Sequence, residues 1–292
     1  MVDHITDTVI KPDTSFADPE ADRATRLRNF PWWFVAIILI AIFASYWIFT
    51  TPNYRKAFDF IRIGLKTTIQ TSLISYMIAL FIGLLAGLGR ISRNILINNA
   101  ARLYVELIRG IPMLVLIFFI ALVGVPIAVD GINSFGHWLG TIGIIDISPD
   151  FSFINNQAFP MNVRAIVALS VTYGAFLAEI FRAGIQSIGR GQTEAARSLG
   201  MSYGQSMRYV ILPQAVRNVL PALGNDFVAM VKDSSLVSVL AVRDITQVAR
   251  LYAGSTFRYR EAYVTLSVMY LTLTVVLSLV VQAIERRLRK ND

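Results

Sequence analysis

The chain has 292 residues, of which 55% are hydrophobic and 16% are charged, and its net charge is +8. An ordinary soluble domain carries about 25% charged residues, so this composition argues against a soluble protein of this length. The sequence holds no cysteine and only two histidines, far apart, which excludes disulfides and thiolate metal sites and argues against zinc. The basic residues are scattered around the apolar runs and form no single stripe, which argues against nucleic-acid binding.

Four uncharged apolar runs predict transmembrane helices, because about 20 helical residues cross a hydrocarbon core of about 30 Å. These runs are residues 32–50, 67–88, 110–129 and 262–283. Two less regular segments are interpreted as further crossings. One is 165–178, extended through Glu179 and Arg182, and the other is 220–242, which charged residues interrupt. We therefore expect an all-α polytopic membrane protein with six transmembrane helices.

The N-terminal tail, residues 1–31, is polar, and Arg23, Arg26 and Arg28 directly precede the first apolar run. Because basic residues accumulate on cytoplasmic segments, this tail is expected in the cytoplasm. The run 32–50 exceeds the apolar region of a cleaved secretory signal, about 7 to 15 residues, and so predicts an additional N-terminal membrane anchor. Six crossings return the C-terminal tail, 286–292, to the cytoplasm.

The segment 130–161 follows the third run and is expected outside the membrane, because it carries three aspartates and no Lys or Arg. Its glycines and Pro149 predict an irregular chain, and it is long for a connection between helices. Two interpretations remain open. The insert is a disordered or partly helical loop, or it is a surface that docks or gates an external partner.

The cytoplasmic loop 189–217 lies between the fourth and fifth crossings and predicts two short helices. Residues 192–199 favour the first helix, with Glu194 expected near its N-terminus, where the helix dipole stabilises an anion. Gly200 can adopt the left-handed conformation that ends a helix. Ser202 and Gln205 have the spacing of a capping box that begins the second helix.

Pro213 is expected to limit or kink this second helix after Leu212, because proline lacks the backbone N–H that continues a helix. Ala195 and Ala196 leave one face of the first helix narrow enough to insert into a groove of another protein. The loop could equally be a plain cytoplasmic linker with helical propensity, since Glu-Ala-Ala alone is a common tripeptide.

The order Glu-Ala-Ala, then glycine, then Leu-Pro within one cytoplasmic loop resembles the coupling loop of binding-protein-dependent ABC importer permeases. The resemblance implies the ABC importer type-1 permease fold and a short helix that inserts into a cleft of a cytoplasmic ATPase subunit. The positions that correspond to this coupling element are Glu194, Ala195, Ala196, Gly200, Val210, Leu212 and Pro213. Val210 stands where isoleucine is usual in the family.

Three further stretches resemble permeases for polar amino acids, a subfamily that includes histidine, glutamine and arginine importers. They are Arg-Gly-Ile-Pro at 109–112, Ala-Glu-Ile-Phe-Arg-Ala-Gly at 178–184 with its continuation to 188, and Lys-Asp-Ser-Ser-Leu at 232–236. The resemblance covers about residues 64–287 and implies a permease domain at 64–285. The first crossing and the insert 130–161 depart from the shortest family members, which have five crossings.

Glu179 with Arg182, and Glu106 with Arg109, are three residues apart on a helix and are expected to form structural ion pairs. The alternative is that these charged residues belong to a substrate site.

In the fifth crossing, Asp226 and Asp233 share one helix face, and Lys232 lies about 100° away. Two interpretations of these charges remain open. In one, Lys232 neutralises a carboxylate between packed helices. In the other, this helix face, together with Ser234 and Ser235, lines the path of a zwitterionic amino acid.

The resemblance implies a transporter subunit that is not itself an enzyme, located in the bacterial inner membrane. The implied partners are cytoplasmic ATPase subunits, an external amino-acid-binding protein and a second permease chain, identical or related. No phosphate-binding Gly-x-x-x-x-Gly-Lys-[Ser/Thr] loop occurs, so ATP and Mg²⁺ are expected on the ATPase and no cofactor on this chain. The alternatives are a permease of the same superfamily for another small solute, and a membrane sensor or scaffold that docks a signalling protein.

Overall fold

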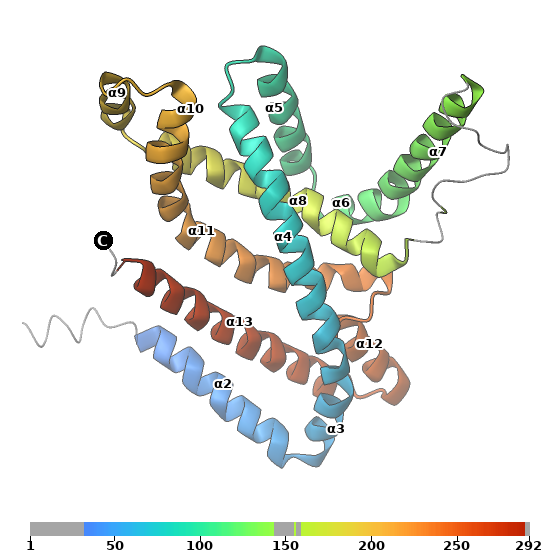
Figure 1. Cartoon of the computed structure of the whole chain (residues 1–292). Coiled ribbons are helices and arrows are strands. Elements are labelled where there is room, and N and C mark those ends of the chain that lie inside the picture. Colours follow the sequence, from blue (N-terminus) through green and yellow to red (C-terminus); the bar gives the residue numbers. More distant parts are fainter. Residues whose placement is uncertain (1–31, 143–154, 156–158, 290–292) are drawn as a thin grey trace, which may run out of the picture. The chain divides into compact units, whose positions relative to one another are not determined.

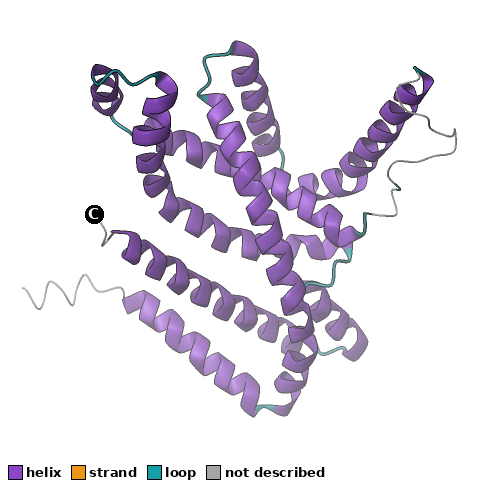
Figure 2. Cartoon of the chain, viewed as in Figure 1, coloured by secondary structure: helices purple, strands orange, loops and turns teal. Residues whose placement is uncertain are grey.

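The computed structural model of the chain describes residues 32–142, 155 and 159–289. Every regular element in these ranges is helical, and no strand occurs among them (Figure 2). The described residues divide into two separate compact units at residues 44 and 45, and the packing described below belongs to the second unit. The all-α architecture expected from the apolar runs is confirmed for the described residues.

The helices follow one another in the order labelled in Figure 1. The first half of the chain forms α2 (Trp32–Thr50), α3 (Pro52–Ile61), the short 3-10 turn η1 (Arg62–Gly64), α4 (Leu65–Arg90), α5 (Ile95–Gly110), α6 (Met113–Phe119), the π-helical η2 (Ile120–Gly124) and α7 (Val125–Thr141). The second half forms α8 (Met161–Gln186), α9 (Arg190–Ser198), α10 (Tyr203–Ser206), the π-helical η4 (Met207–Ile211), α11 (Leu212–Asp233), the 3-10 helix η5 (Ser234–Leu240), α12 (Ile245–Thr256) and α13 (Tyr259–Arg289).

Five helical segments of the described chain are long and apolar enough to cross a membrane. They are Trp32–Thr50, Pro52–Arg90, Met113–Thr141, Met161–Gln186 and Tyr259–Arg287. The fifth expected crossing, 220–242, is not among these segments and corresponds to α11, which has 22 residues and carries four charged side chains. At about 1.5 Å per residue, α11 is about 33 Å long, the length that a crossing needs.

The third apolar run extends further than the sequence indicated. Helical structure continues from Met113 through η2 to Thr141, so the first third of the insert 130–161 is helical. The insert is therefore partly helical, as one of the two interpretations allowed, and not irregular up to Thr141. Three of its glycines lie inside α7, because one glycine weakens a helix by only about 1 kcal/mol. Most of the insert beyond residue 142 lies outside the described residues.

The fifth crossing also begins and ends earlier than expected. Its α-helix runs from Leu212 to Asp233 and is followed by η5, in place of a single helix over 220–242. The expected crossing 220–242 would have placed Lys232 and Asp233 near its middle. They lie instead in the last turn of α11. Asp226 remains inside the helix.

Helices α4 and α8 cross at small residues. A Cβ atom on Gly83 would lie 2.6 Å from the Leu177 Cβ, and one on Gly87 would lie 2.9 Å from the backbone oxygen of Ala178. Gly174 of α8 meets Ile82 of α4 at a similar separation. Gly83 and Gly87 form a Gly-x-x-x-Gly element, which lets two helix backbones approach closely in a membrane.

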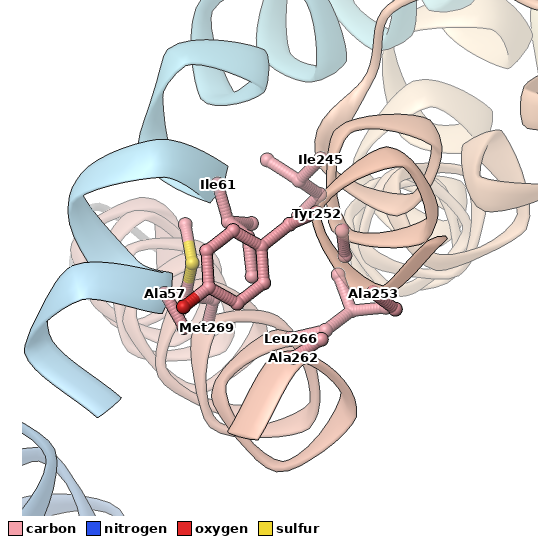
Figure 3. Packing of buried hydrophobic residues seen from close by; sticks show 9 residues of the cluster. Ala57, Ile61, Ile245, Tyr252, Ala253, Ala262, Leu266 and Met269 are labelled. Carbon is pink, nitrogen blue, oxygen red and sulfur yellow. The ribbon is translucent and has the colours of Figure 1, made fainter. Parts of the chain in front are cut away.

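Two helices from the second half of the chain pack on α3 (Figure 3). Ala57 and Ile61 of α3 meet Tyr252 of α12 and Leu266 and Met269 of α13, all of them buried, and Figure 3 shows these side chains converging. The start of α12 is fixed by Asp244, whose buried side chain accepts a hydrogen bond from the Gln247 N–H at 2.8 Å. Residues far apart in sequence thus form one buried apolar cluster within the second unit.

Candidate functional site

The first helix of the loop 189–217 is α9, and it ends in the geometry that Gly200 was expected to give. Gly200 has φ +80°, in the left-handed region. Its N–H donates to the Arg197 carbonyl at 2.9 Å, and the Met201 N–H donates to the Ala196 carbonyl at 3.1 Å. These two bonds form a Schellman motif, which satisfies the last carbonyls of a helix. The expected left-handed conformation of Gly200 at the end of α9 is therefore confirmed.

The second helix begins with the expected capping box. The Gln205 N–H donates to the Ser202 Oγ, and the Ser202 N–H donates to the Gln205 side chain at 2.9 Å. Pro213 was expected either to end this helix or to kink it, and it does not end it. The chain passes through the π-helical η4 directly before the proline and continues as α11. A π turn shifts the hydrogen-bond register, which accommodates the missing N–H of proline.

The outer surface of α9 differs in two respects from the sequence interpretation. Glu194 is exposed but is the fifth residue of α9, beyond the first turn, because the helix begins at Arg190 and not at residue 192. Ala195 is exposed, whereas Ala196 is only 3% exposed and faces inward. The expected narrow face therefore includes Ala195 but not Ala196. Val210, Leu212 and Pro213 lie where α10, η4 and α11 form one continuous helical segment.

Polar side chains tie α9 and the end of α8 to α11. The Gln214 amide donates to the Gln192 side-chain oxygen at 3.3 Å, and the Asn218 amide donates to the Ser187 hydroxyl at 3.1 Å. Close by, Gly184 of α8 faces Val219 of α11 so tightly that no Cβ would fit. Side-chain contacts therefore connect α11 both to α9 and to the end of α8.

The turn between α4 and α5 also contacts the loop 189–217. The Arg93 guanidinium lies over the Tyr203 ring of α10, 5.6 Å from its centroid. A cavity of about 300 Å³ separates α9 from this turn, and Ile91, Thr193 and Tyr203 are among its lining residues. The second half of the loop thus packs against the α4–α5 turn.

An ion-pair network lies beneath these contacts and joins three helices. Glu179 of α8 pairs with Arg182, as the sequence predicted, and also with Arg90 of α4 at 2.6 Å. Arg90 lies 3.4 Å from Glu106 of α5. The expected pairing of Glu106 with Arg109 is wrong: Arg109 lies over the Phe176 ring, 5.9 Å from its centroid. The spacing allowed the pair, but the packing of α5 on α4 presents Glu106 to Arg90.

A second polar cluster lies where α8 meets the last turns of α11. The Tyr173 hydroxyl donates to the Asp233 carboxylate at 2.6 Å. Asp226 is half-buried on the same helix face. Near it, the Tyr76 hydroxyl of α4 donates to the Leu223 carbonyl at 2.5 Å. Two carboxylates and two phenols from three helices therefore approach one another.

Lys232 does not neutralise these carboxylates. It is exposed, and among residues 32–142, 155 and 159–289 no ion pair joins it to either aspartate. Ser234 is buried and donates to the Val231 carbonyl at 2.7 Å, which caps the end of α11, and Ser235 is half-buried. The cluster therefore presents net negative charge.

Sequence reasoning missed Arg90, Tyr76 and Tyr173, because their partners lie 60 to 147 positions away along the chain. It also missed the glycine contact of α4 with α8, although Gly83 and Gly87 have a recognisable spacing inside an apolar run. No group of three or more metal-ligating side chains occurs in the described part of the chain.

Comparisons with known proteins point to one protein family. A protein family described as "binding-protein-dependent transport system inner membrane component" matches residues 79–290. The probable glutamine ABC transporter permease protein GlnM of Bacillus subtilis (strain 168) is 36% identical over 228 residues, which cover 78% of this chain and 93% of the relative. The glutamine transport system permease protein GlnP of Escherichia coli (strain K12) is 33% identical over 226 residues, covering 77% and 91%.

The arginine transport system permease protein ArtQ of Bacillus subtilis (strain 168) is 32% identical over 233 residues, covering 80% of this chain and 94% of the relative. Among solved structures, that of an amino acid ABC transporter with histidines aligns with a TM-score of 0.63 and 35% identity, covering 78% of this chain and 94% of that one. The inward-facing MetNI methionine ABC transporter aligns with a TM-score of 0.57 at 20% identity, which shows the shared fold. The chain therefore belongs to the family of binding-protein-dependent transport system inner membrane components, and it is a multi-pass permease subunit of an ABC importer.

Proposed function

We propose that this permease subunit imports a polar amino acid that an external binding protein delivers. The observation that carries the proposal is the 35% identity, over 78% of the chain, to a solved amino acid ABC transporter. The relatives that carry glutamine and arginine in their names support the same substrate class. A second permease chain, identical or related, completes the transporter.

Energy for transport enters through α9 from a separate cytoplasmic ATPase, which binds ATP and Mg²⁺. The exposed Glu194 and Ala195 and the reversal at Gly200 support this assignment, together with the return through Val210, Leu212 and Pro213. Residues 64–285 form the transport domain, 32–50 is an additional anchor, and both termini lie in the cytoplasm.

The substrate path passes the polar cluster formed by α8 and α11. A zwitterionic amino acid carries an ammonium group, which the carboxylates of Asp226 and Asp233 attract. Lys232, in the same turn as Asp233, is available to the α-carboxylate. Ser235 adds a hydroxyl at the end of α11, whereas Ser234 is buried and its hydroxyl is bonded to the Val231 carbonyl. Tyr173 holds the Asp233 carboxylate through its hydrogen bond, so the anion is oriented before the substrate arrives.

The experiment is ATP-driven uptake into proteoliposomes that contain the chain with its ATPase, its binding protein and, where separate, its second permease. Labelled glutamine, arginine, histidine, glutamate, an opine and an osmolyte are each supplied in separate uptake assays. One of the amino acids is expected to accumulate. Accumulation of only the opine or the osmolyte would contradict the proposed substrate class.

In the same assay, Asp233→Asn removes one negative charge from the cluster and keeps the side chain's shape. We expect uptake to fall about tenfold, the effect of about 1.4 kcal/mol of lost interaction. Co-purification with the ATPase is expected to stay unchanged, because Asp233 lies at the far end of α11 from the coupling loop. Asp130→Asn, at an exposed carboxylate of α7, is the matched control. Unchanged uptake in Asp233→Asn would remove this residue from the path.

A further inference from the structure

Arg90 is the last residue of α4, and its side chain is only 12% exposed. Its guanidinium reaches two other helices, at 2.6 Å from Glu179 of α8 and 3.4 Å from Glu106 of α5. Exposed ion pairs contribute little, and Glu106 is an exposed partner. The Arg90 guanidinium is mostly buried, and its removal leaves Glu179 paired with Arg182 alone among the described residues. One side chain thus joins polar groups of three helices.

The backbone of Arg90 fixes the following turn as well. The Asn98 amide of α5 donates to the Arg90 carbonyl at 2.6 Å and lies 3.4 Å from the Ser92 carbonyl. The Asn94 side chain accepts from the N–H groups of Leu96 and Ile97 and caps α5. Residues 90–98 are therefore a well-bonded turn, and a force on this turn reaches Arg90 without being absorbed by a flexible loop.

The same turn touches the second helix of the coupling loop. Arg93 lies over the Tyr203 ring, and Ile91 and Met207 line the cavity beside α9 together with Tyr203. A displacement of α9 and α10 consequently reaches α8 by two routes. One is the direct chain connection through residues 187–189. The other runs from Tyr203 through the α4–α5 turn and Arg90 to Glu179.

We infer that Arg90 is a positioning residue for coupling: it makes the α4–α5 turn and α8 move together when the ATPase displaces the coupling loop. The inference rests on the proposed function, because it assumes that force enters through α9. Arg90 itself contacts neither ATP nor the transported solute. When Arg90 is replaced, ATP hydrolysis continues but less amino acid is imported for each ATP hydrolysed. Loss of a merely structural ion pair would lower the rates of ATP hydrolysis and of import in the same proportion.

The test measures the ratio of amino acid imported to ATP hydrolysed in proteoliposomes of the complete transporter. For Arg90→Gln we expect this ratio to fall about fivefold or more, the lower range of a typical coupling free energy. Co-purification with the ATPase and basal ATP hydrolysis should persist. Arg90→Lys keeps the charge but loses the fork that spans two carboxylates, so its ratio should lie between those of wild type and Arg90→Gln.

Two further variants keep the test decisive if Arg90→Gln accumulates poorly. Tyr203→Leu removes the exposed contact with Arg93 and should lower the same ratio, and adding Arg90→Gln to it should lower the ratio little further. Arg102→Gln, at an exposed arginine of α5, is the matched control and should transport as wild type does.

The inference is overturned if Arg90→Gln or Tyr203→Leu lowers uptake and ATP hydrolysis in equal proportion, or leaves their ratio unchanged. Failure of the proposed function is a different result. In that case the wild-type transporter imports no amino acid at the expense of ATP, whatever residue stands at position 90.

Discussion

At the scale of single residues, Gly200 is the position where backbone conformation alone decides the identity of the side chain. Its φ of +80° lies in the left-handed region, and a Cβ atom placed there would meet nothing within 4 Å. Steric exclusion by neighbours is therefore not the reason for glycine. The reason is that an L-residue with a Cβ atom loses about 1–2 kcal/mol in this conformation.

We expect Gly200→Ala to loosen the end of α9 without disturbing the rest of the fold. A loss of about 1–2 kcal/mol should lower the hydrogen-exchange protection of the Gly200 and Met201 amides by about five- to thirtyfold. Gly200→Asn should be milder, because asparagine tolerates the left-handed region. Gly204→Ala is the control, since Gly204 also faces open space but has no positive φ. Equal protection in all three variants would contradict the conformational explanation.

At the scale of helices, the contact of α4 with α8 determines where the polar groups meet. Gly83 and Gly87 bring the two backbones together, and this approach places Arg90, one turn further along α4, beside Glu179. In the opposite direction along the same pair, Tyr76 and Tyr173 come to face α11. Small residues in one apolar helix therefore position both the ion-pair network and the carboxylate cluster.

We expect Gly87→Leu to force α4 away from α8, because a Cβ would lie 2.9 Å from the Ala178 backbone oxygen, which cannot rotate away. Overpacking of this kind costs about 1–3 kcal/mol or more. The midpoint of thermal unfolding in detergent should fall clearly. Gly131→Leu introduces the same side chain in α7, where nothing lies within 4 Å, and should leave the midpoint almost unchanged. A similar fall in both variants would indicate an effect of the leucine itself.

The sequence specified the helical elements well where the determining forces are local. Ser202, Gln205 and Gly200 carry caps whose hydrogen bonds span a few residues, and their roles were predictable from spacing. The end of α11 was not, because the change to 3-10 geometry at Ser234 has no distinct sequence signal. Arg90 and Glu179 are 89 positions apart, so only the packing of α4 on α8 reveals their pair.

At the scale of the whole molecule, α11 connects the two candidate sites directly. It begins beside the coupling loop at Leu212 and ends at Asp233, a distance of about 30 Å along the helix at about 1.5 Å per residue. Its first half is bonded to α9 and to the end of α8 through Gln214 and Asn218. Movement of the loop is therefore expected to change the position of the carboxylates that we propose to face the solute.

A separate ATPase is proposed to bind α9, and two adjacent residues of this helix allow a direct test. A photo-reactive side chain is introduced at the exposed Ala195 or at its neighbour Ala196, which is 3% exposed. After irradiation of membranes, the covalent partners are identified by mass spectrometry. From position 195 we expect an abundant adduct with a subunit that carries a phosphate-binding loop. From position 196 we expect little of this adduct. No such adduct at 195, in membranes where ATP-driven uptake proceeds normally, would contradict the proposed binding.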